Sequence, residues 1–393
     1  MPRFLTLLLL IMTPLSASPA ADFGDFDRRA RAGEVLNVVF LGGSLTWGAQ
    51  ATDPQLTSYR ALTSRRLEAR YPVARFRFWD AAIGGTGSQL AAYRLERDVL
   101  ARQPDLVFLD FTVNDFPHNP PDADKLASYE SLVRRLIGRG AAVVQVILPL
   151  MRDVGANPPP RPLDNLHIAI GEAYGLPLAN ALTLARARVA AGATTPELLW
   201  DLPADRTHPG DAGYALYAEA AWDAFEKAAQ TGARCRLPER MLNADTYMTV
   251  NRSLLSALPA LPSGWTAGRP HRSAVAFDFT SSRWMDTLGI AATGAQPLRL
   301  KVRAGSVMIF GESTPTSGKY QVTIDGGPAK TYPALCETGN RRLVQLLAQG
   351  LDPAREHEVV ITPLLDEGQE LRIESICAAG APATVELIRG PSP

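Results

Sequence analysis

The fold is decided by one stretch of the chain, 35-VLNVVFLGGSLT-46. Its first seven residues form a run that is apolar except for Asn37 and is typical of a buried β-strand. The pair Gly42-Gly43 then predicts a tight turn, which leaves Ser44 at the carboxyl end of that strand. Because open parallel sheets bind their ligands at the carboxyl ends of their strands, we expect a functional site around this serine.

Downstream of this stretch, short apolar runs alternate with longer amphipathic segments up to about Phe225. This alternation indicates strands connected by helices in a mostly parallel sheet, and hence a three-layer α/β domain. Further strands are predicted at 75–82, 106–113 and 142–150, and helices at 58–70, 89–102, 125–139, 164–174 and 211–227.

After Gln230 the segments become short, alternating and rich in β-branched residues, with Gly and Pro between them. This pattern predicts a β-sandwich over residues 235–393, following an α/β domain over residues 21–230. The linker, near 228–233, is short, so we expect the sandwich to be docked on the first domain. Strands are predicted at 298–302, 320–324, 357–362, 370–377 and 384–388.

The amino terminus has the pattern of an export signal. Arg3 precedes an apolar run over 4–15, and Ser18-Pro19-Ala20 supplies small residues for cleavage. The run is shorter than the roughly 20 residues that span a bilayer, and no later segment is as apolar. We therefore expect a signal peptide over 1–20 and a secreted or periplasmic protein without an integral membrane segment after cleavage.

The overall composition excludes several functions. The 393 residues carry 40 basic and 40 acidic side chains, without the basic clusters that nucleic-acid binding needs. The three cysteines are too widely spaced for a metal site, and we expect no metal and no cofactor. In an oxidising compartment one disulfide can persist, and Cys336 with Cys377 is the expected pair, leaving Cys235 free.

A second motif, 205-DRTHP-209, lies just before the last predicted helix of the α/β domain. A serine becomes a nucleophile when an imidazole removes its proton, and the imidazole needs an acceptor on its other nitrogen. Asp205 can reach His208 within one loop and leave its second nitrogen facing Ser44. Two alternatives stay open: Asp201 as the acid, or a surface histidine beside a helix capped by Asp211.

Two more strand ends offer hydrogen-bond donors for an oxyanion, which forms when an ester carbonyl is attacked. They are 83-IGGTGS-88 and 113-VND-115, where a glycine N–H and the Asn114 amide can donate without adding charge. The alternative interpretations are a flexible turn and an Asx cap. Gly84 and Gly85 remain equivalent candidates at this point.

Together these segments resemble the four blocks of the SGNH hydrolase (GDSL-like esterase) superfamily, in the expected order and over roughly residues 35 to 226. The resemblance implies a flavodoxin-like fold with Ser44 as nucleophile, His208 as general base and Asp205 as its partner. It also implies an oxyanion hole made by the N–H groups of Ser44 and Gly85 and by the side chain of Asn114.

The sequence departs from the family pattern at two positions. The first block has Gly-Gly-Ser-Leu-Thr in place of Gly-Asp-Ser-Leu, and Val113 stands where a glycine usually precedes Asn-Asp. The appended, jelly-roll-like sandwich is similar in arrangement to that of carbohydrate esterases and is a candidate for glycan binding.

Several other side chains have two interpretations. His118 and Asp115 follow Asn114 and either line the cleft or are polar groups of a loop, the latter being the expected interpretation. His167 is interpreted as a helix residue. Trp47 beside the serine turn stacks on a sugar or belongs to the core. Four aromatic residues of the sandwich likewise either stack on a sugar or belong to the core, and the core is their expected place: Trp265, Trp284, Tyr320 and Tyr332.

We therefore expect an exported serine esterase that hydrolyses acyl esters, acetyl above all, on a carbohydrate through an acyl-enzyme. One alternative is a lipid esterase or lysophospholipase. Another, of a different class, is a non-catalytic carbohydrate-binding protein of the cell envelope.

Overall fold

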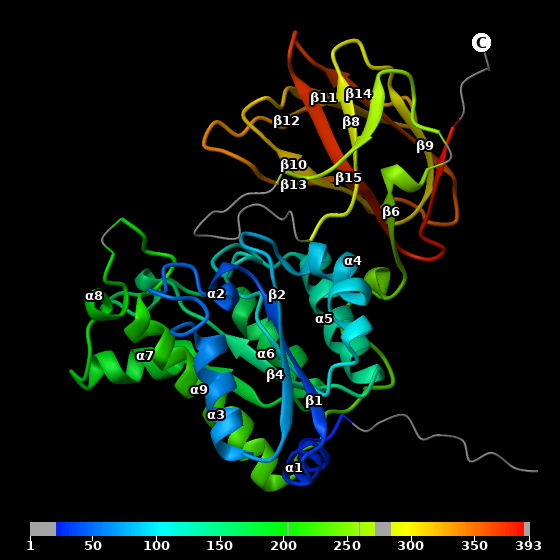
Figure 1. Cartoon of the computed structure of the whole chain (residues 1–393). Helices are drawn as coiled ribbons and strands as arrows, with labels where there is room; N and C mark the ends of the chain where they lie inside the picture. Colours follow the sequence, from blue (N-terminus) through cyan, green and yellow to red (C-terminus); the bar gives the residue numbers. More distant parts are fainter. Residues whose placement is uncertain (1–20, 203, 259, 272–283, 389–393) are drawn as a thin grey trace, which may run out of the picture.

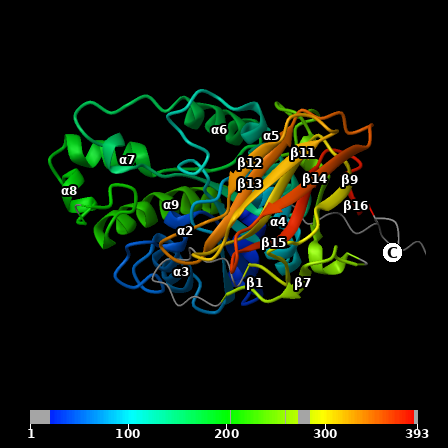
Figure 2. The same ribbon diagram turned by 90° about the horizontal axis from the view of Figure 1, so that it is seen from above.

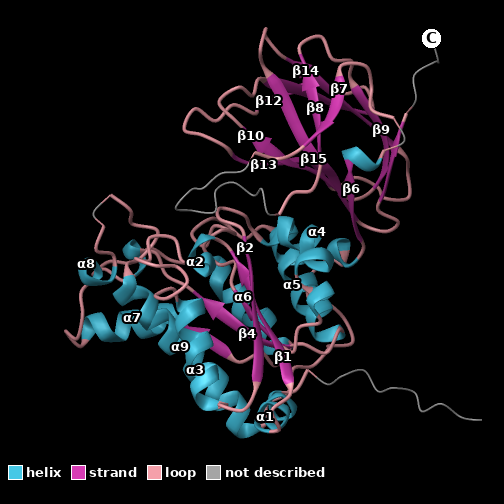
Figure 3. Cartoon of the chain, viewed as in Figure 1, coloured by secondary structure: helices cyan, strands magenta, loops and turns pink. Residues whose placement is uncertain are grey.

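A computed structural model describes residues 21–202, 204–258, 260–271 and 284–388. An α/β domain forms the lower part of the molecule in Figure 1, and a β-sandwich lies above it. The view coloured by secondary structure separates the helix-rich part from the strand-rich part (Figure 3). The predicted fold class, a flavodoxin-like three-layer domain followed by an all-β sandwich, is confirmed.

The α/β domain is built on a parallel sheet in the order β2-β1-β3-β4-β5, the strand order of flavodoxin-like folds. The strand at 35–42 is exposed only at its first residue and is buried throughout from Val38 to Gly42, in line with the largely apolar run at 35–41. The five strands are β1 (Val35–Gly42), β2 (Arg75–Ala82), β3 (Leu106–Leu109), β4 (Ala142–Ile147) and β5 (Leu178–Asn180).

Helices cover both faces of this sheet. One face packs against α4 (Ser88–Asp98), α5 (Ala123–Gly138) and α6 (Pro162–Ala173). The other face packs against α1 (Phe23–Arg31), α3 (Tyr59–Arg70), α7 (Ala181–Ala190) and α9 (Asp211–Thr231). Two short helices, α2 (Ser44–Trp47) and α8 (Pro196–Leu199), lie near the carboxyl edge. Within the described residues, no helix is both long enough and apolar enough to cross a membrane.

The sandwich consists of two antiparallel sheets that enclose their own apolar core. The sheet nearer the α/β domain has the order β13-β10-β15-β8-β7, with β6 also paired to β15: β6 (Val250–Leu254), β7 (Trp265–Gly268), β8 (Leu288–Ala292), β10 (Ser306–Ser313), β13 (Arg341–Gln349), β15 (Glu370–Ala379). The far sheet has the order β12-β11-β14-β9-β16: β9 (Leu298–Arg303), β11 (Lys319–Ile324), β12 (Lys330–Pro333), β14 (His357–Leu364), β16 (Thr384–Leu387).

The two domains share one continuous hydrophobic cluster. It joins residues beneath α4 and α5 to Tyr247, Met308 and Phe310 of the sandwich, all of them buried. A buried carboxylate fastens the connecting segment, because Glu130 on α5 accepts the backbone N–H groups of Leu242 at 2.7 Å and Asn243 at 2.8 Å. The sandwich is thus docked on the α/β domain, as the short linker predicts.

The expected disulfide is wrong, because Cys235, Cys336 and Cys377 are all free thiols. Cys377 lies on β15 in the cluster shared with the α/β domain, whereas Cys336 follows β12 in the far sheet. The two are therefore held in different layers. Burial raises the pKa of the Cys377 thiol to about 12, so this side chain stays protonated.

β3 ends at Leu109, four residues before the predicted end at Val113. The carboxylate of Asp110 accepts hydrogen bonds from the backbone N–H and the hydroxyl of Thr112, which turns the chain away from the sheet. This turn starts the loop that carries Asn114 to the carboxyl edge.

Candidate active site

The candidate site lies at the carboxyl edge of the parallel sheet, beneath the sandwich (Figures 1 and 2). Ser44 is the first residue of α2, directly after β1. Gly85 lies in the turn between β2 and α4, and Asn114 follows β3. Asp205 and His208 lie in the loop before α9. The structure thus brings together all five residues named from the sequence.

Ser44, His208 and Asp205 are connected in series by hydrogen bonds. His208 Nε2 lies 2.7 Å from Ser44 Oγ, and His208 Nδ1 lies 2.7 Å from Asp205 Oδ2. Ser44 is 9% exposed, so it is nearly withdrawn from bulk water. This is the arrangement of a nucleophile, a general base and the acid that orients the base.

Asp205 is held in place by its own loop. Its Oδ1 accepts the backbone N–H groups of Thr207 at 2.9 Å and His208 at 3.0 Å. Gln50 Nε2 donates to Oδ2 at 3.2 Å. Burial raises the pKa of the Asp205 carboxyl, but the hydrogen bonds from His208 outweigh burial, and the pKa lies below its usual value. The carboxylate therefore stays ionised opposite the imidazole.

Asp201, the alternative acid, lies elsewhere. A methyl group on Gly210, the residue before α9, would come 2.5 Å from the carboxyl carbon of Asp201. Asp201 therefore packs against the start of α9, and it is Asp205 that contacts the imidazole.

Asn114 lies against the residue that precedes the serine. A Cβ at Gly43 would come 3.0 Å from Asn114 Cγ, so only glycine leaves room for the amide there. This close approach accounts for the second glycine of the first motif. It also places the Asn114 side chain next to the Ser44 backbone.

The two candidate glycines differ in exposure and conformation. Gly84 is buried, whereas Gly85 is exposed and has a φ of 66°. Thr86 N–H donates to the Ile83 carbonyl at 3.3 Å, which closes a four-residue turn over 83–86. Among four-residue turns, a positive φ at the third residue but not at the second is characteristic of a type II turn.

Asp115 and His167 are more deeply buried than the sequence suggested. Asp115 accepts the backbone N–H of Ser88 at 2.9 Å, and burial raises its pKa to about 7. His167 stacks on the ring of Tyr129 with centroids 3.9 Å apart, and burial lowers its pKa to about 3. Both groups therefore favour their neutral forms, and Asp115 fastens the start of α4 beneath the site.

His118 belongs to a polar network beside the site. Its Nε2 lies 2.6 Å from Asp153 Oδ1, and its Nδ1 lies 2.6 Å from Arg152. Met151 N–H donates to the Arg206 carbonyl at 3.1 Å, which links this network to the loop of the imidazole. His118 is therefore a polar group that joins two loops.

The aromatic candidates lie mostly in the core. Trp265, Trp284 and Tyr320 are buried, and Tyr332 stacks on Tyr320 with centroids 5.5 Å apart. Trp47 ends α2 and is half-buried.

Sequence reasoning missed two side chains at the site. Gln50 contacts Asp205 from the loop after α2, and Arg342 of the sandwich lies against Gly85. No local pattern marks either residue.

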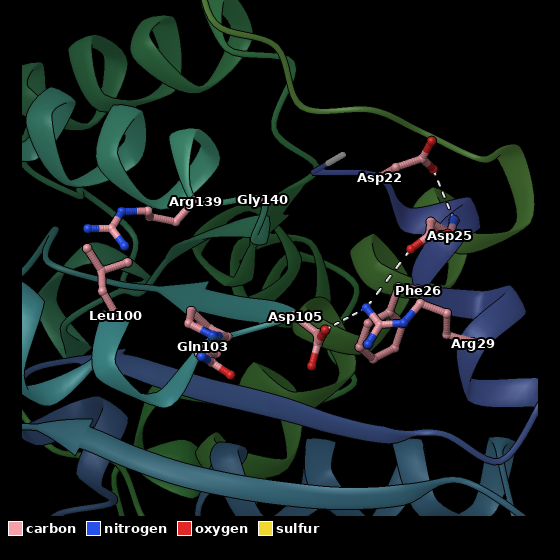
Figure 4. A pocket seen from close by; sticks show the side chains of 10 residues that line it. Asp22, Asp25, Phe26, Arg29, Leu100, Gln103, Asp105, Arg139 and Gly140 are labelled. Atoms are coloured by element: carbon pink, nitrogen blue, oxygen red, sulfur yellow. Dashed lines mark hydrogen bonds and ion pairs between the residues drawn. The ribbon is translucent and has the colours of Figure 1, made fainter. Parts of the chain in front are cut away.

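A separate pocket of about 570 Å³ opens at the amino edge of the sheet (Figure 4). Arg29 crosses it and pairs with Asp105 at 2.6 Å. Among the ten described residues that line it, none is Ser, Cys or His. This pocket therefore lacks the nucleophile and base that the carboxyl edge provides.

The fold and the site have the arrangement of an ester hydrolase of the SGNH type. Residues 40–216 match the model of the GDSL-like Lipase/Acylhydrolase family, so this part of the α/β domain is similar to that family. The chain is therefore a carboxylic ester hydrolase, as predicted.

Two solved structures share the two-domain fold, each with a TM-score of 0.76 and over 93% of this chain. Both are of a two-domain esterase (CEX) active on acetylated mannans, one of them co-crystallized with mannopentaose. Their identities to this chain are 22% and 23%, with 98% and 99% of their own chains covered. None of the curated proteins matches the chain.

Proposed function

We propose that this protein is an exported serine esterase that removes acyl groups, acetyl above all, from a carbohydrate. The observation that carries the proposal is the series of two 2.7 Å hydrogen bonds that joins Ser44, His208 and Asp205. The same edge of the sheet presents the backbone of Gly85 and the side chain of Asn114.

The first step is attack of Ser44 Oγ on the ester carbonyl carbon. His208 Nε2 takes the hydroxyl proton as the new C–O bond forms. Asp205 accepts the Nδ1 proton of the imidazole, which fixes the tautomer and stabilises the imidazolium. The carbonyl oxygen becomes an anion, and the N–H groups of Ser44 and Gly85 and the Asn114 amide are its donors.

The second step releases the alcohol. The tetrahedral intermediate collapses, the ester C–O bond breaks, and His208 gives its proton to the departing sugar oxygen, which leaves as a hydroxyl group. Water then attacks the acyl-serine with His208 again as base, and the carboxylic acid leaves. No redox change occurs in either half-reaction.

Three observations support a neutral acetylated glycan as substrate. The chain resembles, over both domains, an esterase described as active on acetylated mannans. The net charge of zero favours a neutral substrate over an anionic lipid surface. The expected signal peptide over 1–20 fits an enzyme that meets polysaccharides outside the cytoplasm.

The test is hydrolysis of p-nitrophenyl acetate and acetate release from acetylated mannan and xylan by the full chain. Ser44→Ala should abolish both activities and fluorophosphonate labelling, while Ser263→Ala, an exposed serine of the sandwich, should leave them unchanged. Faster hydrolysis of long-chain than of acetyl esters would favour a lipid esterase. Failure of the wild type to react with the probe would favour a non-catalytic protein.

A further inference from the structure

The strand β13 presents a charged residue to the α/β domain. Along β13, Val344 and Leu346 pack against the hydrophobic cluster that both domains share. Leu343 and Leu347 point the other way, into the core of the sandwich. Arg342 is in phase with Val344 and Leu346, so its side chain faces the α/β domain.

The Arg342 side chain ends on the turn that carries Gly85. A Cβ built on Gly85 would come 2.6 Å from Arg342 Cζ and 3.3 Å from Nε, which is closer than carbon atoms pack. The guanidinium thus occupies the space that any side chain at position 85 would need. This end of the sandwich overhangs the carboxyl edge of the sheet (Figures 1 and 2).

Arg342 contacts the turn that contains the Gly84–Gly85 peptide, and the orientation of this peptide decides whether the Gly85 N–H can donate to the oxyanion. Gly85 has a positive φ, and Gly84 is not among the described glycines with positive φ. This combination matches a type II turn over 83–86. A type II turn converts to type I by rotating the peptide between its two central residues. Here that rotation would take Gly85 to negative φ and turn its N–H to the opposite side.

A second contact from the sandwich reaches the serine turn. Arg94 on α4 is completely buried, and its guanidinium lies 5.6 Å from the ring centroid of Trp284. The same guanidinium pairs with Asp98 at 3.4 Å and donates to the Gly42 carbonyl at 3.5 Å. The sandwich therefore contacts the Gly85 turn directly through Arg342 and is linked to the serine turn through Arg94.

We infer that Arg342 is a positioning residue, supplied by the sandwich, that holds the Gly84–Gly85 peptide with the Gly85 N–H in the oxyanion hole. The inference rests on the proposed function. It makes the sandwich part of the hydrolytic unit for every ester, including one that has no sugar. A guanidinium that fills the space beside Gly85 restrains movement of this turn, and such movement would take the donor out of the site.

The experiment measures kcat and KM of the full chain for p-nitrophenyl acetate, which offers no glycan to the sandwich. Arg342→Ala should lower kcat about 10- to 100-fold, which is a smaller loss than that expected for deletion of an oxyanion donor. KM should change less than about twofold. Arg342→Lys should recover part of the loss. Millimolar guanidinium should restore kcat of Arg342→Ala, an effect that a folding defect would not show.

The matched control is Arg299→Ala, which breaks an exposed pair with Glu358 on the far sheet and should leave kcat unchanged. Wild-type kcat in Arg342→Ala would overturn the inference, and so would a loss seen with acetylated mannan alone, which would indicate a sugar contact. If Arg342→Ala does not fold, Arg342→Lys with unaltered kcat would overturn it equally. A wild type that neither hydrolyses esters nor labels at Ser44 would refute the proposed function instead.

Discussion

Substitution of Gly85 by alanine adds one carbon atom at the contact between the two domains and so tests their coupling. The added methyl group would come 2.6 Å from Arg342 Cζ, and the residue has a φ of 66°. A non-glycine residue in this region costs about 1–2 kcal/mol. The arginine side chain can shift away from the methyl group, whereas the backbone strain is relieved by rotation of the peptide, which removes the Gly85 N–H from the site.

We therefore expect Gly85→Ala to lower kcat/KM for p-nitrophenyl acetate by about 100- to 1000-fold, the loss typical of a missing oxyanion donor. Arg342→Ala alone should cost about 10- to 100-fold. The double variant should be no worse than about Gly85→Ala, because both changes release the same peptide. The two losses would then be coupled by at least about 1.4 kcal/mol.

The matched control is Gly294→Ala in the sandwich. Gly294 also has a positive φ, of 80°, and no described heavy atom would lie within 4 Å of its Cβ. This variant carries the same backbone strain and should keep wild-type kcat/KM. Near-normal activity of Gly85→Ala, or losses that multiply in the double variant, would refute the reasoning.

Three further predictions concern single carboxyl groups. Asp205→Asn should lower kcat roughly 10³- to 10⁴-fold, whereas Asp201→Asn should change it less than about twofold, and equal losses would contradict the assignment. Glu130→Gln places an amide nitrogen against backbone donors and should destabilise the chain by about 2–3 kcal/mol, seen as a lower thermal midpoint. Glu219→Gln, at a partly exposed ion pair with Arg188, should cost at most about 1 kcal/mol, and equal midpoints would refute the role of Glu130. Burial raises the pKa of Asp115 to about 7, so the native carboxyl keeps a proton that the unfolded chain releases above about pH 4. Stability should therefore fall as pH rises between these values, and the thermal midpoint of Asp115→Asn should fall less; parallel curves would contradict this.

The sequence predicts the parallel sheet well because its signals are local. The run at 35–41 has a single polar residue, Asn37, and each long helix repeats its apolar face over several turns. β10 (Ser306–Ser313) was missed because it is buried on both faces, between the sandwich core and the α/β domain. A strand of this kind shows no alternation of polar and apolar residues. β5, with only three residues, is too short to show a period.

The candidate site likewise contains some residues that local motifs predict and others that only tertiary packing brings in. Ser44, Asp205 and His208 were found because their spacing within short motifs reflects the chemistry. Arg342 comes from a strand about 250 residues away in sequence from the turn that it contacts, and only the packing of one domain on the other brings it there. The cysteine pairing failed for the same reason, since spacing alone does not tell which layer a strand occupies.

The hydrophobic cluster that runs across both domains limits how this chain can be re-engineered. Cutting the connection between the domains would expose Met308 and Phe310 on one fragment and the apolar side of α4 on the other. Each fragment would carry an exposed apolar surface, and expression of either alone should yield aggregates. The sandwich is therefore a poor donor for grafting onto other enzymes, and a fusion partner belongs at the ends of the intact chain rather than between its halves.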